Sequence, residues 1–220
     1  MAKPEPLGLL GGSFDPIHYG HLRFAEEAIS TLGLARVRLI PAGVPKHRAT
    51  PHATAAQRLA MVEIAAAGNP RLSVDPAEVL SDAPSYTVPT LERLRQELGA
   101  QQPLVLLLGA DAFAGLASWH RWEALISLAH IGVASRPGHA LNTQAWPAAL
   151  AELWRARSGP IAALREAPVG RIVQFDITPL DISATAIRAL LARRASPRYL
   201  LPDALIDYIA LHRLYSPKEP

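Results

Sequence analysis

The sequence predicts an α/β fold built on a doubly wound, mostly parallel sheet with helices packed against it. Residues 7–10 are apolar and end at two glycines, and apolar side chains then recur at helical spacing from residue 22 to residue 32. Residues 103–108 are apolar without alternation, which is typical of a parallel strand covered on both faces. A chain of 220 residues, half of them apolar, suits one such domain. We therefore expect a single domain over residues 1–220.

Strand and helix patterns continue to alternate along the chain. Further strands are expected at residues 37–41, 72–74, 103–108, 130–134 and 171–175. Further helices are expected at residues 54–67, at residues 85–98, behind Ser183, and from about Tyr208 through Leu214-Tyr215. Gly33 and Gly99 are placed to end the helices before them, since glycine tolerates left-handed geometry. Residues 139–170 are expected to be an insertion before the last strand, and the last helix gives the fold a helical C-terminal end.

Composition narrows the class of protein. Twenty-two basic against 19 acidic residues give a net charge of +3, which suits a phosphate-bearing substrate but is far weaker than the basic stripes of nucleic-acid binders. The absence of cysteine excludes a disulfide framework and thiolate metal sites. No apolar run approaches the roughly 20 residues of a membrane helix, and residues 1–6 lack an apolar signal region. We expect a cytoplasmic enzyme without a nucleic-acid or membrane partner; an oligomer is possible.

The first functional pattern combines glycines with two histidines where a strand gives way to a helix. It reads Gly11-Gly12-Ser13-Phe14-Asp15-Pro16, then His18-Tyr19-Gly20-His21. Glycines let a ligand approach the backbone, and the first turn of a helix attracts anions. Two imidazoles three residues apart can face one ligand and donate to phosphate oxygens, more strongly when protonated. A glycine pair or one histidine alone is weak evidence, but the combination predicts a phosphate site; P-loop and Gly-x-Gly-x-x-Gly patterns are absent.

The second pattern is Ile182-Ser183-Ala184-Thr185-Ala186-Ile187-Arg188. Ser183 is a natural N-cap, and that role alone would explain it. Thr185 and Arg188 are three residues apart, so they share a face near the anion-attracting start of the helix. Arginines 193, 194 and 198 are better explained as the solvated, cationic end of that helix.

Together these patterns resemble the nucleotidylyltransferase superfamily, and more narrowly the bacterial nicotinate mononucleotide adenylyltransferases. The resemblance implies a Rossmann-like fold and adenylyl transfer from ATP to nicotinate mononucleotide, giving nicotinate adenine dinucleotide and pyrophosphate. It also implies that His18, His21 and Arg188 are catalytic. The ATP-binding residues would be Gly11, Gly12, Ser13, Phe14, His18, His21, Ser183, Thr185 and Arg188.

The same resemblance implies where the mononucleotide binds. The implied residues are His47, Arg48, Tyr86, Thr87, Asp111, Trp119, His120 and Arg136. In that family Trp119 would lie against the nicotinate ring, and backbone N–H groups near Thr87 and His120 would receive the carboxylate. From the residues alone, Tyr86 and Thr87 could instead pack against and cap their helix, and Asp111 could cap another. Residues 42–48 could be an ordinary solvated loop. Lys46 departs from the family pattern and has no assigned role.

Mg²⁺ is expected to be carried mainly by the ATP phosphates, without a protein metal site, because it keeps several waters and needs few protein ligands. Three alternatives remain. The same fold could use another acceptor, such as nicotinamide mononucleotide, phosphopantetheine or a cytidylyl substrate. The chain could be a relative of class I aminoacyl-tRNA synthetases, although it is short and has no Lys-Met-Ser-Lys-Ser-like loop. It could also be a non-catalytic nucleic-acid-binding module, with steeply salt-dependent binding.

Overall fold

The computed structural model describes residues 4–45, 50–135 and 141–216. The described residues form two compact units. The first unit takes residues 4–10, 27–38 and 86–179, and the second takes residues 11–26, 39–85 and 180–216. Strand β1 (Leu7–Gly12), helix α1 (Tyr19–Leu32) and strand β2 (Arg36–Pro41) each contribute to both units.

Six strands form one sheet in the order β4-β2-β1-β6-β7-β8, with β4 at Leu72–Val74. Counted by position along the chain, this is the order 3-2-1-4-5-6 of doubly wound nucleotide-binding folds. The order reverses between β1 and β6, and sheets of this kind bind ligands at the carboxyl ends of the strands at such a reversal. The glycine pair lies at the carboxyl end of β1. The predicted fold class is therefore confirmed.

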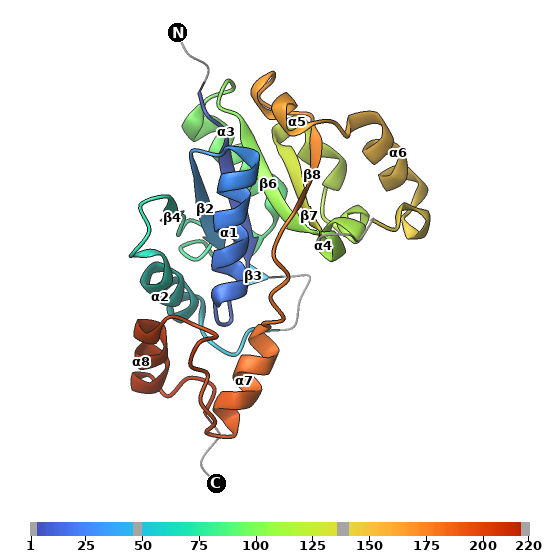
Figure 1. Cartoon of the computed structure of the whole chain (residues 1–220). Coiled ribbons are helices and arrows are strands. Elements are labelled where there is room, and N and C mark those ends of the chain that lie inside the picture. Colours follow the sequence, from blue (N-terminus) through green and yellow to red (C-terminus); the bar gives the residue numbers. More distant parts are fainter. Residues whose placement is uncertain (1–3, 46–49, 136–140, 217–220) are drawn as a thin grey trace. The chain divides into compact units, whose positions relative to one another are not determined.

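In the first unit, β6 (Leu104–Gly109), β7 (His130–Ser135) and β8 (Ile172–Asp176) lie side by side and pair in parallel (Figure 1). Residues 104–108 are all buried, because these apolar side chains alternate between two covered faces. Helix α3 (Thr87–Leu98) contacts α5 (Leu125–Leu128), and α4 (Ala110–Ala114) contacts β6 and β7. Gly99, with φ of 83°, ends α3 as predicted.

The segment expected to be an insertion is largely helical where it is described. It contains helix α6 (Ala148–Arg157) between two 3-10 turns, η3 (Thr143–Ala145) and η4 (Ile161–Arg165). Trp146 precedes α6 and packs edge-on to Phe113, with ring centroids 5.1 Å apart. The structure describes residues 141–170 of this segment, and its identity as an insertion stays a prediction.

In the second unit, α2 (Ala55–Ala66) contacts α8 (Asp203–Leu211) (Figure 1). Helix α2 begins with a capping box, in which Thr54 accepts from the backbone of Gln57 and the Gln57 side chain accepts from the backbone of Thr54. Strands β3 (Val44–Pro45) and β5 (Pro84–Ser85) form a separate parallel pair. Helix α7 (Ala184–Ala192) completes the unit.

Two sequence-based expectations need correction. Strand β1 continues through Gly11 and Gly12 instead of breaking at them. The last helix ends at Leu211, so the prediction that it runs through Leu214-Tyr215 is wrong. The residues beyond it leave helical geometry: Arg213 has φ of 49° and Tyr215 has φ of 61°. Left-handed backbone is uncommon for non-glycine residues, so periodicity alone could not have placed this turn.

Candidate active site

The glycine loop is shaped by an inward-facing phenylalanine. Phe14 has φ of 48°, is buried, and is followed by a cis Asp15-Pro16 bond. A Cβ atom at Gly12 would lie 3.0 Å from the Phe14 ring, tighter than nine in ten such contacts, so a larger residue there would require the ring to shift. The Gly12 carbonyl accepts a hydrogen bond from the Ala42 amide at 2.9 Å. This arrangement fixes the backbone between β1 and α1.

The two histidines of the first pattern lie together at the start of α1. The ring centroids of His18 and His21 are 3.8 Å apart and their planes are tilted by 31°. His21 also meets the Phe14 ring edge-on at 5.1 Å. The His18 amide donates to Nδ1 of His21 at 3.3 Å, so neutral His21 carries its proton on Nε2, where it can donate to a ligand. The prediction that both imidazoles share one face is confirmed.

His18 differs from His21 in its surroundings. Its side chain is only 6% exposed, and burial lowers its pKa from 6.5 to about 4. Its Nδ1 atom is buried and, among the described residues, has no hydrogen-bond partner. His18 is therefore neutral near pH 7, rather than the protonated donor that the sequence allowed. An unpaired buried nitrogen is costly, and a ligand atom that pairs with it would recover that cost.

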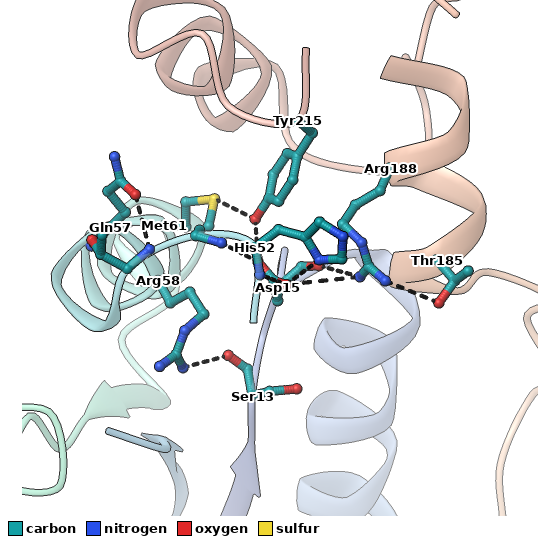
Figure 2. Close-up of polar contacts among 11 residues, drawn as sticks. Ser13, Asp15, His52, Gln57, Arg58, Met61, Thr185, Arg188 and Tyr215 are labelled. Atoms are coloured by element: carbon teal, nitrogen blue, oxygen red, sulfur yellow. Dashed lines mark hydrogen bonds and ion pairs between the residues drawn. The ribbon is translucent and has the colours of Figure 1, made fainter. Parts of the chain in front are cut away.

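The buried carboxylate of Asp15 is the centre of a polar network, here called the Asp15 network, that comprises Asp15, His52, Ala53, Arg188 and Tyr215. Figure 2 shows Asp15 with His52, Arg188 and Tyr215 around it. Oδ2 accepts from the His52 amide at 2.8 Å, and Oδ1 accepts from the Ala53 amide at 3.1 Å. The Tyr215 hydroxyl donates to Oδ1 at 2.7 Å. Burial alone would raise the pKa of Asp15, but these hydrogen bonds and the Arg188 charge outweigh it and lower the pKa overall.

Arg188 connects this network to the start of α7. Its guanidinium donates to the Asp15 backbone carbonyl at 2.7 Å and to the Thr185 hydroxyl at 3.3 Å, while Asp15 Oδ2 lies 3.9 Å away (Figure 2). Ser183 is the N-cap of α7, since its hydroxyl accepts from the Ala186 amide at 3.1 Å. The structure thus confirms the cap and the shared face of Thr185 and Arg188. Their contact with ATP stays a prediction.

Arg58 was not identified from the sequence, although it supports the glycine loop. It projects from α2, is 1% exposed, and donates to the carbonyls of Ser13 at 2.7 Å and Gly43 at 2.9 Å. Burial lowers its pKa, and the Asp15 charge opposes that effect. Its position in the helix could have indicated its burial. Arg58 precedes the buried Met61 and Val62 by three and four residues, so it lies on the apolar face of α2. A charged residue on such a face indicates a specific partner.

The predicted mononucleotide residues that are described lie in the first unit. The rings of Tyr86 and His120 face each other at 4.6 Å, with planes tilted by 32°. Arg121, which has φ of 55°, donates twice to the Glu92 carboxylate at 2.7 and 3.2 Å. Trp119 directly precedes His120 in the chain. It is half-buried and caps the C-terminal end of the 3-10 turn η1 (Leu116–Ser118).

The remaining mononucleotide residues divide into two groups. Thr87 begins α3 and Asp111 is exposed in the first turn of α4, and neither residue is the cap: the N-caps are Tyr86 and Gly109. The alternative of helix capping is therefore wrong for both. His47, Arg48 and Arg136 lie outside the described residues, as does Lys46.

No group of three or more His, Asp or Glu residues suited to a metal ion occurs within residues 4–45, 50–135 and 141–216. No helix in the described part of the chain is long and apolar enough to cross a membrane.

Asp15 and Tyr215 join Arg58 as residues whose structural roles were not predicted from the sequence. Asp15 was part of the quoted pattern without a role, and Tyr215 was expected to be an ordinary helical residue.

Comparison with known proteins identifies relatives over nearly the full length. A family model described as cytidylyltransferase-like matches residues 9–190. A Dechloromonas aromatica (strain RCB) protein named "Probable nicotinate-nucleotide adenylyltransferase" is 58% identical over 212 residues, covering 96% of this chain and 98% of the relative. An Aeromonas hydrophila protein of the same name is 50% identical over 218 residues, covering 99% and 100%.

Among solved structures, the Plasmodium falciparum nicotinic acid mononucleotide adenylyltransferase complexed with NaAD has a TM-score of 0.70 and covers 96% of this chain and 97% of its own. At 17% identity this likeness shows the fold alone. The assignment to one family within this fold rests on the two full-length relatives. The patterns at residues 11–21 and 182–188, which resemble the same family, agree with it. The chain belongs to the nicotinate-nucleotide adenylyltransferase family, among the cytidylyltransferase-like proteins.

Proposed function

We infer that this protein transfers the adenylyl group of ATP to nicotinate mononucleotide, producing nicotinate adenine dinucleotide and pyrophosphate in NAD biosynthesis. The observation that carries this function is the 58% identity to a nicotinate-nucleotide adenylyltransferase across 96% of the chain. The paired histidines and the Thr185–Arg188 pair, all in the second unit, supply the phosphate-directed groups that such a reaction needs.

In this reaction an oxygen of the mononucleotide 5′-phosphate forms a bond to the α-phosphorus of ATP. The bond from that phosphorus to the bridging oxygen breaks, and pyrophosphate leaves with the electron pair. A phosphate monoester carries about −1.5 to −2 charge at neutral pH, so the nucleophile needs no protein base. The residues therefore act by positioning the phosphates and stabilising charge, as is usual in phosphoryl transfer.

His18 and His21 are assigned to the α- and β-phosphates, together with the backbone of Gly11, Gly12, Ser13 and Phe14. The His21 Nε2–H group can donate to the bridging oxygen as charge builds there. His18 is neutral before ATP binds, and its Nδ1 atom, which has no hydrogen-bond partner within the described ranges, would provide a second polar contact. A nearby phosphate favours the protonated imidazole, so the pKa of His18 should rise when ATP binds.

Ser183, Thr185 and Arg188 are assigned to the β- and γ-phosphates, which become the leaving pyrophosphate. Among the described residues, Arg188 makes two hydrogen bonds, to Asp15 and to Thr185. A guanidinium carries five N–H donors, so it retains donors for an anion while these two bonds hold it in place. Its position three residues behind Thr185, near the start of α7, adds the favourable field of the helix N-terminus.

Mg²⁺ is proposed to enter with ATP, bound mainly through phosphate oxygens and water, the ligands this cation prefers. When bound, it would neutralise part of the phosphate charge. We further propose that His47, Arg48, Tyr86, Thr87, Asp111, Trp119, His120 and Arg136 bind the mononucleotide. The stacked Tyr86 and His120 rings support an aromatic environment for the pyridine ring.

The proposal extends to the whole protein. Residues 1–220 would form one nucleotidylyltransferase domain, and the continuous family match over residues 9–190 supports this extent. Residues 139–170 would be an insertion in that domain. The enzyme would act in the cytoplasm, where ATP is available, and without nucleic-acid or membrane partners.

A coupled pyrophosphate-release assay with ATP tests the function across candidate acceptors. The panel contains nicotinate mononucleotide, nicotinamide mononucleotide and phosphopantetheine, with CTP replacing ATP in a parallel series. We expect the highest kcat/KM for nicotinate mononucleotide with ATP. A higher value for phosphopantetheine, or turnover only with CTP, would assign the chain to another branch of the same fold.

A further inference from the structure

The last described residues place a phenol against the glycine loop. After α8 ends at Leu211, the Leu214 side chain is buried and its amide donates to the Ile209 carbonyl at 3.0 Å. Tyr215 then turns inward with φ of 61° (Figure 2). Its hydroxyl reaches Asp15 Oδ1 at 2.7 Å and lies 3.9 Å from the Met61 sulfur atom. A residue 200 positions away in sequence thus contacts the first functional pattern.

The Tyr215 hydroxyl acts on Asp15 as a donor. Burial raises the pKa of Tyr215, and the adjacent Asp15 carboxylate raises it further, so the phenol stays protonated. Among the described residues, the hydroxyl and the backbone amides of His52 and Ala53 are three neutral hydrogen-bond donors to Asp15, and the His52 ring nitrogen Nδ1 lies 3.4 Å from Oδ2. Neutral donors therefore satisfy much of this buried negative charge.

Without these neutral donors, the guanidinium of Arg188 would be the charged group placed to pair with the Asp15 carboxylate. Its guanidinium is 3.9 Å from Asp15 Oδ2, beyond hydrogen-bond distance, and it donates instead to the Asp15 carbonyl and to Thr185. A carboxylate that lost a neutral donor would attract this guanidinium more strongly, because unsatisfied buried charge is costly. A close ion pair would compete with any phosphate for the same N–H groups.

We propose that Tyr215 is a positioning residue for ATP: by donating to Asp15, its hydroxyl keeps Arg188 beside Thr185 and available to the phosphates. This inference rests on the proposed function, in which Arg188 holds the β- and γ-phosphates. It assigns the C-terminal tyrosine a part in ATP use without direct contact with substrate.

Tyr215→Phe tests the inference, because it removes one oxygen atom and keeps the ring. We expect the KM for ATP to rise about tenfold, as for loss of a hydrogen bond to a charged group, with the KM for nicotinate mononucleotide unchanged within about twofold. Tyr199→Phe is the matched control: it removes a hydroxyl from the same C-terminal region, where the side chain is 83% exposed. It should leave both KM values unchanged.

A double-mutant cycle separates positioning from a general structural effect. In an Arg188→Ala background, Tyr215→Phe should change the Kd for ATP by less than about twofold, because the group it positions is gone. Equal effects in both backgrounds would overturn the inference. Circular dichroism and urea unfolding check the fold of each variant. If Tyr215→Phe does not fold, Tyr215→His replaces it. Because histidine keeps an N–H donor, its KM for ATP should lie between the unmutated value and a roughly tenfold increase.

The outcomes also separate this inference from the proposed function. An unchanged ATP KM in Tyr215→Phe would overturn the positioning role while leaving adenylyl transfer standing. If the unmutated protein does not convert nicotinate mononucleotide, the proposed function fails, and the Kd for ATP alone in the same four proteins still decides the role of Tyr215.

Discussion

The burial of neutral His18 predicts a specific dependence of stability on pH. Its pKa is about 4 in the folded protein, against 6.5 when solvent-exposed. The unfolded chain therefore binds more protons between these values, so stability is full above pH 6.5 and is lost as the pH falls toward 4. The difference of 6.5 − 4, at about 1.36 kcal/mol per pH unit, gives a total loss of about 3 kcal/mol. By pH 5 the linkage relation gives a loss of about 2 kcal/mol.

Urea unfolding of the unmutated protein and of His18→Asn at pH 8, 7, 6 and 5 isolates this contribution. His18→Asn should be less stable at pH 8, because the smaller side chain leaves part of the buried space of the imidazole unfilled. Because asparagine does not titrate, the gap between the two free energies of unfolding should shrink by about 2 kcal/mol at pH 5. Other groups, including the buried His130 with its lowered pKa, are common to both proteins and cancel. A gap that stays constant from pH 8 to pH 5 would refute the argument.

Four substitutions test the assignments of other residues. His21→Ala should lower turnover at saturating ATP by about 10²–10³-fold, as loss of a transition-state donor does, and near-normal steady-state turnover would remove His21 from the mechanism. Arg188→Ala should raise the KM for ATP in the forward reaction and for pyrophosphate in the reverse reaction by about tenfold or more, whereas selective loss of mononucleotide affinity would place Arg188 in the other pocket. Trp119→Ala should lower kcat/KM for nicotinate and nicotinamide mononucleotides by similar factors, about tenfold each, since stacking does not distinguish acid from amide; a large change in their ratio would contradict this. Gly43→Ala should destabilise the fold by about 1–3 kcal/mol in urea unfolding, because its Cβ would lie 2.0 Å from the Glu78 carbonyl oxygen, and an unchanged midpoint would contradict the packing.

The sequence correctly predicted the features that depend on residues close together in the chain. The apolar run at residues 104–108 became a buried strand, and Gly33, with φ of 62°, ends α1 as expected. Ser183 caps α7, and Arg188 reaches Thr185, because a helix brings residues three apart onto one face. These features require only neighbouring residues, so one sequence suffices to predict them.

The Asp15 network could not be predicted in the same way, since its members are far apart in the chain. The hydrogen bond from Tyr215 to Asp15 depends on a left-handed turn after α8, where the apolar pattern favoured a longer helix. Arg58 similarly finds its carbonyl partners on two separate loops. The protonation state of His18 depends on its burial by the folded chain, which the histidine pattern in the sequence did not reveal.

The clearest test of adenylyl transfer follows the label from each ATP phosphate. The purified protein is incubated with nicotinate mononucleotide, Mg²⁺ and ATP labelled with ³²P at either the α- or the γ-phosphate, and the products are separated by chromatography. We predict that the α-label appears in nicotinate adenine dinucleotide and the γ-label in pyrophosphate, in equal amounts. Label from the γ-phosphate on the mononucleotide, or release of inorganic phosphate without a dinucleotide, would contradict adenylyl transfer.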